Sequence, residues 1–253
     1  MSKQSIAETT TEALQEASPF TPAPGAAREP VTGPLHAMQL HRSDLTPDKI
    51  LGSGQFGEVY LAYHTVKSKK KGTKIIKRAV KMLKGVADAA AKDEFVHECN
   101  MMVEAGEHTN LVKMVGVSLQ QAPWLCVLEF LPNGDLQGLL QDLAADGITL
   151  ELGVQLDMCR QLTEGGAHLA SRRLVHMDLA ARNVLVGKNN VMKIADLGLT
   201  HLCCDEGPYY VLPARIPLAL KWLSPEAMES LFFSEYSDVW AMAVTFWEIF
   251  MYS

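Results

Sequence analysis

The sequence lacks the cysteine pattern of a disulfide-stabilised or zinc-binding protein. Its 253 residues include five cysteines, an odd number, and no two of them have CxxC spacing. No histidine stands beside a cysteine at the usual spacing of metal ligands. This pattern is typical of a reduced, intracellular chain. The five residues are Cys99, Cys126, Cys159, Cys203 and Cys204.

Long uncharged apolar runs are also missing. The N-terminus has no apolar segment of the kind that a secretory signal requires. The longest apolar segment, residues 239–252, contains Glu248 and is shorter than the ~20 residues that a membrane-spanning helix needs. We therefore expect a buried helix at this place, no export signal, and no membrane segment in this chain.

The chain has no strong excess of one charge. Its formal net charge of -6 gives no general attraction to nucleic acid or anionic membranes, so nucleic acid is not an expected partner. Residues 67–78 are dense in lysine, but like charges repel one another into solvent, which favours an exposed hairpin tip over a nuclear-import or lipid-binding role. With 48% hydrophobic residues, the chain can bury the core of one large domain or two small ones.

Apolar side chains are sparse at the N-terminus. Residues 1–41 are rich in Ala, Thr, Glu and Pro, a composition that is typical of disorder. We expect a disordered tail over residues 1–43, with order beginning near Leu45. A plain linker is favoured over a proline-rich docking segment.

A glycine-rich stretch follows. Residues 52–57 contain glycines at positions 52, 54 and 57 and lie between two apolar segments, which predicts two strands joined by a tight turn. Glycines at this spacing let backbone N–H groups approach phosphate oxygens without interference from a Cβ atom. A strand follows where a dinucleotide-binding fold would start a helix, so the pattern favours a phosphate-covering hairpin. A hairpin without a ligand remains the alternative at this point.

A lysine stands inside the next predicted strand, residues 78–83. Lys81 lies among apolar neighbours, and after a glycine hairpin it is a candidate to bind phosphates. Its partner should be an acid on the predicted helix over residues 92–107, whose apolar residues recur at helical spacing. Glu98 lies beside this apolar face. Glu94 is the competing candidate, and its place in the first turn favours solvation.

The segment 124–136 marks a boundary between two halves of the chain. An apolar strand breaks at Pro132, Asn133 and Gly134 and passes into a more helical region. Nucleotide bases often bind in crevices between lobes, so the backbone groups of Glu129 and Leu131 are candidates to bind an adenine edge. A linker without a ligand is the alternative.

Residues 176–183, His-Met-Asp-Leu-Ala-Ala-Arg-Asn, contain the groups that phosphoryl transfer requires. Asp178 could accept a proton from an attacking hydroxyl, and Asn183 could bind a divalent cation beside a phosphate. A second predicted hairpin over residues 184–194 leads to Asp196, a candidate second metal ligand. One such aspartate is more often a turn former, but the order of all these groups makes a chance arrangement improbable.

From about Leu45 to its end, the chain resembles a protein kinase catalytic domain, and more narrowly a tyrosine kinase. Residues 179–183, Leu-Ala-Ala-Arg-Asn, are similar to the tyrosine-kinase form of the catalytic loop. Lys221 and Trp222, ahead of Ser-Pro-Glu, are similar to the substrate-docking segment of the same family. The resemblance implies an α+β, bilobal fold. It has a small five-stranded N-lobe with one helix over residues 44–131 and a mainly helical C-lobe over residues 132–253 that lacks its last helices.

The resemblance also implies ATP and Mg²⁺ as cofactors and tyrosine-bearing protein substrates as partners. Asp178 would be the catalytic base, Arg182 would lie near the transferring phosphate, and Asn183 and Asp196 would hold magnesium. Lys81 paired with Glu98 would bind the α- and β-phosphates. The other implied ATP-binding positions are Leu51, Gly52, Ser53, Gly54, Gln55, Phe56, Gly57, Val59, Ala79, Leu128, Glu129, Leu131 and Leu185. The expected location is cytoplasmic, or the cytoplasmic part of a longer receptor.

Met177 departs from the family's pattern. It replaces the arginine that usually precedes the catalytic aspartate and that pairs with a phosphorylated residue of the activation segment. A thioether cannot form this pair, so we expect phosphorylation of Tyr209 or Tyr210 to activate the protein weakly or not at all.

The region after residue 212 also departs from the pattern. The stretch before Lys221 is longer than in the family, and the chain ends just after an apolar helix that should therefore expose apolar surface. A pseudokinase-like ATP-binding scaffold or an inactive fragment is consequently the alternative to an active tyrosine kinase. The presence of Lys81, Asp178, Asn183 and Asp196 favours the active enzyme.

Overall fold

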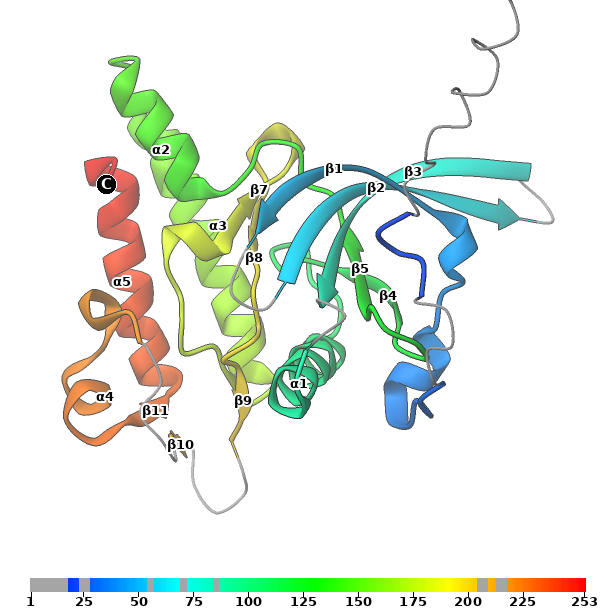
Figure 1. Cartoon of the computed structure of the whole chain (residues 1–253). Helices are drawn as coiled ribbons and strands as arrows, with labels where there is room; N and C mark the ends of the chain where they lie inside the picture. Colours follow the sequence, from blue (N-terminus) through cyan, green and yellow to red (C-terminus); the bar gives the residue numbers. More distant parts are fainter. Residues whose placement is uncertain are drawn as a thin grey trace, which may run out of the picture.

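The computed structural model describes residues 18–22, 28–53, 57–68, 72–83, 87–203, 209–212 and 218–253. In this part of the chain, a five-stranded antiparallel sheet and one helix form a first lobe, and a mainly helical second lobe follows (Figure 1). The predicted α+β, two-lobed fold is confirmed.

The first lobe is built on a sheet with the strand order β1-β2-β3-β5-β4. Lys81 on β3 lies opposite Val59 on β2 and opposite Cys126 on β5, so it occupies a central strand. The ends of β2 and β3 are exposed as expected for the lysine-rich hairpin, whose tip at residues 69–71 lies outside the described residues. The strands are β1 (Leu45–Ser53), β2 (Gly57–Ser68), β3 (Gly72–Leu83), β4 (Met114–Ser118) and β5 (Leu125–Glu129).

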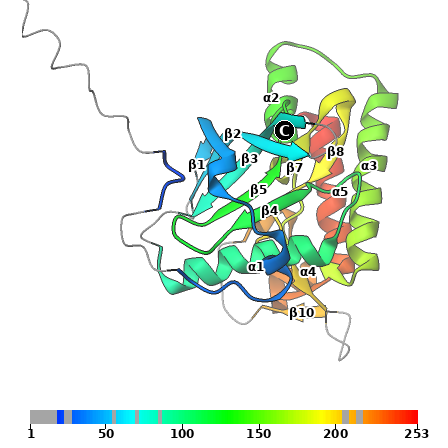
Figure 2. The ribbon, with the colours of Figure 1, turned by 90° about the vertical axis from the view of Figure 1, so that its right-hand side faces the viewer.

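One helix, α1 (Ala89–Ala105), packs its apolar residues against this sheet (Figure 2). It begins earlier than the predicted range of 92–107, because the Asp88 side chain accepts a hydrogen bond from the Ala91 N–H at 2.8 Å and caps the helix there. It ends before Gly106, whose φ of 70° is a left-handed conformation that favours glycine.

The described part of the N-terminal segment, residues 18–22 and 28–43, packs on the sheet. The Leu40 N–H donates to the Val117 carbonyl on the edge strand β4 at 2.7 Å. The Phe20 side chain is only 2% exposed and packs in a core cluster with residues of the sheet. For these described residues, the packing differs from the disordered tail that we expected over residues 1–43, whereas residues 1–17 and 23–27 of that prediction lie outside the described part of the chain.

Two features explain how so few apolar residues dock this segment. The Arg42 guanidinium donates to the Ser118 Oγ at 3.0 Å and to the Phe20 carbonyl at 2.9 Å, which satisfies polar groups at the contact. Gly116 lets the segment approach closely, since a Cβ atom there would lie 2.6 Å from the Met38 carbonyl oxygen. Composition reveals neither feature. Two short 3-10 helices shape the segment, η1 (Gly33–Met38) and η2 (Arg42–Asp44).

The second lobe contains four α-helices and three two-stranded pairings among the described residues. The predicted second hairpin is present, and the small pairings tie distant parts of the lobe together. The helices are α2 (Leu136–Ala145), α3 (Leu152–Ser171), α4 (Pro225–Ser230) and α5 (Glu235–Met251), and the 3-10 helices are η3 (Ala181–Asn183), η4 (Lys188–Asn190) and η5 (Leu220–Trp222). The pairings are β6 (Leu174–Val175) with β9 (His201–Leu202), β7 (Val184–Val186) with β8 (Met192–Ile194), and β10 (Tyr209–Val211) with β11 (Phe232–Ser234).

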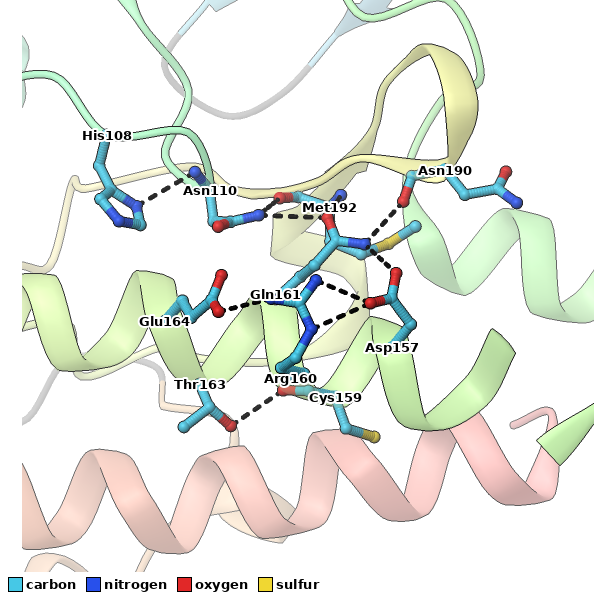
Figure 3. Close-up of polar contacts among 10 residues, drawn as sticks. All are labelled: His108, Asn110, Asp157, Cys159, Arg160, Gln161, Thr163, Glu164, Asn190 and Met192. Carbon is cyan, nitrogen blue, oxygen red and sulfur yellow. Dashed lines mark hydrogen bonds and ion pairs between the residues drawn. The ribbon is translucent and has the colours of Figure 1, made fainter. Parts of the chain in front are cut away.

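A buried amide on α3 holds the β7–β8 hairpin in place (Figure 3). The Gln161 Oε1 accepts hydrogen bonds from the Met192 N–H at 2.9 Å and from the Asn110 Nδ2 at 3.2 Å. Its Nε2 donates to Asp157 at 2.8 Å. Because β8 leads directly into the loop that carries Asp196, this network fixes the starting point of that loop.

The helix α5 is buried on one face only. Ile249 is fully buried, whereas Val239, Trp240 and Trp247 are 66%, 47% and 56% exposed. The predicted buried helix is thus half-buried, and its outer face carries the apolar surface that we expected. None of the described helices has both the length and the apolar composition needed to span a membrane.

Candidate active site

The catalytic-loop candidates form one hydrogen-bonded cluster. The Arg182 guanidinium contacts the Asp178 Oδ1 at 2.5 Å, and the Asn183 Nδ2 donates to the Asp178 Oδ2 at 2.6 Å and to its backbone carbonyl at 2.8 Å. The 3-10 helix η3 contains Arg182 and Asn183, which follow the aspartate by four and five residues, and both side chains donate back to its carboxylate. The Asp178 side chain keeps 23% of its surface exposed, so a hydroxyl can approach a fixed carboxylate from solvent.

A half-buried aspartate on α5 holds the start of this loop. The Asp238 Oδ2 accepts the His176 N–H at 2.6 Å, and its Oδ1 accepts the Met177 N–H at 3.0 Å. Met177 has a φ of 67°, an uncommon conformation for a residue with a side chain, and these bonds stabilise it. Burial raises the pKa of Asp238, and His176 and the two backbone donors oppose this shift.

Lys81 and Glu98 form an ion pair between β3 and α1. The Lys81 Nζ lies 2.5 Å from the Glu98 Oε2, whereas Glu94 is exposed, so the structure brings together the pair that the sequence favoured. Burial lowers the pKa of Lys81, but the carboxylates of Glu98 and Asp196 more than offset this effect and raise it above its ordinary value. Lys81 is therefore a fixed cation at the site.

Asp196 completes the polar cluster. It is exposed, it has a φ of 59°, and its Oδ1 is 3.4 Å from the Gly198 N–H. The Ala195 N–H donates to the Asn183 carbonyl at 2.8 Å, which joins the Asp196 loop to the catalytic loop. Because Asp196 also acts on the pKa of Lys81, the groups of both lobes lie near one another.

The oxygen donors of Asn183 and Asp196 suit Mg²⁺ better than a metal ion whose ligands all come from the protein. The Asn183 amide nitrogen is engaged with Asp178, which leaves its Oδ1 for a cation beside the carboxylate of Asp196. Mg²⁺ is usually bound by one or two protein oxygens together with water and substrate phosphates. The described residues contain no group of three His, Cys, Asp or Glu side chains that could hold a metal ion.

The implied nucleotide-binding positions lie on the strands around Lys81 and on β7. Gly52 on β1 is opposite Val59 on β2, and Ala79 on β3 is opposite Leu128 on β5. Gly57 must be glycine, since a Cβ atom there would lie 2.1 Å from the carbonyl oxygen of Met82. The Leu51, Ser53, Glu129, Leu131 and Leu185 positions are described as well, whereas Gly54, Gln55 and Phe56 lie outside the described residues.

The Glu129 side chain is occupied by the protein itself. Its Oε1 accepts the Lys113 N–H at 2.8 Å and lies 2.8 Å from the Lys193 Nζ. The Glu129 N–H is also engaged, since it donates to the Lys113 carbonyl at 3.0 Å. Of the backbone groups that the sequence suggested, the Glu129 carbonyl therefore remains the candidate for an adenine edge.

Met177 lies in a separate apolar cluster. Its side chain is 5% exposed and packs with residues of the activation segment and its surroundings. Buried members of this cluster are Val175, Cys203, Leu212, Leu223, Ala227 and Phe233.

The sequence did not point to the residues that anchor the catalytic loop. Asp238 is one, and Glu248 is the other: the Glu248 Oε2 accepts the Ala181 N–H at 2.9 Å and the Trp222 Nε1–H at 3.0 Å. A signal was present, because acidic residues inside an apolar helix need buried partners. The identity of those partners depends on tertiary structure.

Comparisons with known proteins agree with this geometry. A family model described as protein tyrosine and serine/threonine kinase matches residues 45–253. The chain is 37% identical over 234 residues to the human tyrosine-protein kinase ABL2. The aligned region covers 91% of this chain and 19% of that protein. The mouse ABL2 is 36% identical with the same coverage, and the Drosophila melanogaster tyrosine-protein kinase Abl is 38% identical over 214 residues, 85% of this chain and 12% of that protein.

The chain thus spans about a fifth or less of the length of these curated relatives. The family match nevertheless begins at the first strand of the sheet and includes every described group of the polar cluster. This chain belongs to the protein tyrosine and serine/threonine kinase family.

Proposed function

We propose that this chain is an ATP-dependent protein tyrosine kinase, which transfers the γ-phosphate of ATP to tyrosine hydroxyls of protein substrates. The observation that carries the proposal is the 2.5 Å ion pair between Lys81 and Glu98, beside the carboxylate of Asp196. An ammonium fixed in this way can bind phosphates while the catalytic loop faces it from the other lobe. The identity to tyrosine kinases supports the choice of tyrosine as acceptor.

Each polar residue has a role in this proposal. Lys81 binds the α- and β-phosphates, and Asn183 and Asp196 hold the magnesium ions. Bound magnesium supplies positive charge that stabilises the negative charge developing in phosphoryl transfer. Asp178 orients the tyrosine hydroxyl and takes its proton, because its carboxylate is held by two donors and is open to solvent.

Arg182 has a second role beside the base. Its guanidinium contacts the Asp178 carboxylate, and it lies 4.8 Å above the Trp222 ring. In this position it can also interact with the transferred phosphate, since guanidinium groups bind phosphate oxygens well.

The nucleotide itself would lie between the lobes. We assign the N-lobe to residues 44–131 and the C-lobe to residues 132–253, with a cytoplasmic location, or a place in the cytoplasmic part of a longer receptor. The proposed ATP contacts are the glycine-rich hairpin, Ala79, the backbone of residues 129–131 and Leu185.

A phosphate-transfer assay with a Glu-Tyr copolymer tests the proposal. We expect transfer by the wild-type chain and a loss of about a hundredfold or more for Lys81→Met, because the variant removes a preorganised charge. Lys77→Met is the matched control, since Lys77 is an exposed residue of the same strand. No transfer by a folded wild-type chain would contradict the proposal.

The second candidate is an ATP-binding scaffold without transferase activity, which Met177 favours because it removes a regulatory arginine. Thermal unfolding with and without Mg-ATP distinguishes the two. A ligand at about 100 times its Kd stabilises the folded state by about 2.7 kcal/mol. Stabilisation by Mg-ATP without phosphate transfer would support the scaffold.

A further inference from the structure

Glu248 is a buried carboxylate that does more than anchor the catalytic loop. It lies on α5 and is only 2% exposed. One of its oxygens, Oε2, accepts hydrogen bonds from the Ala181 backbone in the catalytic loop and from the Trp222 indole in η5. These donors belong to segments about forty residues apart in sequence, so the carboxylate is a bridge between them.

A chain of contacts connects the bridge to the candidate base. The Trp222 ring lies 4.8 Å below the Arg182 guanidinium, and this guanidinium lies 2.5 Å from the Asp178 carboxylate. A shift of Trp222 would therefore move the group that fixes Asp178. Glu248 holds the Trp222 end of this chain of contacts and is shielded from solvent.

Asp238 on the same helix does not form a comparable bridge. Its oxygens accept the N–H groups of His176 and Met177, which are adjacent residues of the catalytic loop. Ten residues separate it from Glu248, about 15 Å along a helix. Asp238 thus fixes the start of the loop, whereas Glu248 fixes the loop relative to η5.

The segment around η5 borders the approach to Asp178. Trp222 contacts Arg182, and the neighbouring Leu218, Leu220 and Leu223 line a pocket of about 330 Å³. Because Lys221 and Trp222 resemble the substrate-docking segment of the family, we expect a polypeptide that brings a tyrosine to Asp178 to contact this segment. The position of η5 consequently decides where the acceptor lies relative to the base.

We propose that Glu248 is a positioning residue that sets the distance between η5 and the catalytic loop, and thereby places the acceptor tyrosine against Asp178. The proposal rests on the tyrosine kinase function proposed above. It predicts that Glu248 governs the use of the polypeptide substrate and leaves nucleotide binding unaffected, because its partners belong to the catalytic loop and η5 and are not among the proposed ATP contacts.

Glu248→Gln and Trp222→Phe test this role by steady-state kinetics with a Glu-Tyr copolymer. The first variant keeps the side-chain volume and removes the charge, and the second keeps a ring and removes the indole donor. Each should raise the KM for the copolymer about threefold to tenfold, since charge-assisted hydrogen bonds are stronger than neutral ones. The KM for ATP should change less than about twofold. The double variant should be less impaired than the product of the single effects, because one substitution weakens and the other removes the same bond.

Glu235→Gln is the matched control. Glu235 is an exposed residue at the start of the same helix, so the substitution makes the same change of charge away from the site. Its KM values should equal those of the wild-type chain. Unchanged copolymer KM values for both test variants, or an equal rise in the KM for ATP, would overturn the proposal.

A readout without catalysis separates this proposal from the proposed function. Hydrogen exchange of the Trp222 indole N–H, measured by NMR and assigned with Trp222→Phe, should be slow in the wild-type chain and at least about tenfold faster in Glu248→Gln. Direct binding of the copolymer should weaken in parallel. If the wild-type chain transfers no phosphate, the proposed function fails, while exchange and binding still decide the role of Glu248. If Glu248→Gln does not fold, Trp222→Phe alone carries the kinetic test.

Discussion

Met177 and Asp178 are neighbours in the chain, yet their side chains lie in opposite environments. Asp178 belongs to a polar cluster in which each carboxylate oxygen accepts a hydrogen bond and part of the side chain faces solvent. Met177 is 5% exposed and packs in an apolar cluster with the activation segment. One loop thus has a chemical side and a packing side.

The backbone at Met177 produces this separation. Its φ of 67° turns the chain sharply between the two residues, and the two bonds to Asp238 hold that turn. In kinases with arginine at this position, the resemblance implies that a charge connects the loop to the activation segment. Here apolar packing makes the connection, so the chemistry and its regulation can be tested by separate substitutions.

The largest expected effect is on the chemical side. Asp178→Asn should reduce phosphate transfer by about 10²- to 10⁴-fold, because an amide cannot accept the tyrosine proton, and general-base catalysis contributes effects of this size. Stabilisation by Mg-ATP should remain, since Asp178 is not a proposed phosphate ligand. Transfer to the copolymer and thermal unfolding measure the two properties.

Asp142→Asn serves as the control for that substitution, because Asp142 is an exposed residue of α2. It should leave both properties unchanged. An Asp178→Asn protein that labels tyrosine at the wild-type rate would remove Asp178 from the mechanism and with it the contrast between the two neighbours.

A smaller effect, on stability, is expected on the packing side. Met177→Arg would bury a cation in the apolar cluster, and an uncompensated buried charge costs about 3 kcal/mol or more. Urea-induced unfolding measures the change in the free energy of unfolding. Met251→Arg is the control, because Met251 is 58% exposed at the end of α5, where a cation is well tolerated. Equal stability of the two variants would mean that the packing side accepts a charge.

The chemical side was predictable from sequence because its residues are close together or follow a fixed order. Asp178, Arg182 and Asn183 lie within a span of six residues, and Lys81 stands among the apolar residues of one predicted strand. The choice of Glu98 over Glu94 followed from helical periodicity and from the place of Glu94 in the first turn of the predicted helix. Local spacing and periodicity carry this information.

The packing side was not predictable, because its contacts join segments that are distant in sequence. Met177 was recognised as a departure, but its burial against Leu212 and Phe233 depends on how the activation segment returns to the loop. The docking of residues 28–43 was missed for the same reason, since one arginine and the close approach at Gly116 replace a long apolar face. Asp238 and Glu248 were visible only as acids in an apolar helix.

The smallest expected effect is that of phosphorylation on the activation segment, and it is the sharpest test of the comparison. The Tyr210 ring is stacked on His201 at 3.8 Å and packs against the Met177 cluster, while Tyr209 is stacked on Phe232 at 4.3 Å. Residues 209–212 are therefore held by aromatic and apolar side chains without a phosphate. A thioether at position 177 offers no donor that a phosphate could recruit.

Phosphorylation of Tyr209 and Tyr210 should consequently change kcat/KM for the copolymer by less than about twofold. The comparison is between the phosphorylated chain and a Tyr209→Phe/Tyr210→Phe double variant carried through the same treatment, which corrects for phosphorylation elsewhere. A gain of about tenfold, equivalent to about 1.4 kcal/mol in the barrier, would mean that another cation replaces the missing arginine. Equal activity would mean that the packing around Met177 already holds the segment in the state that a phosphate would otherwise have to stabilise.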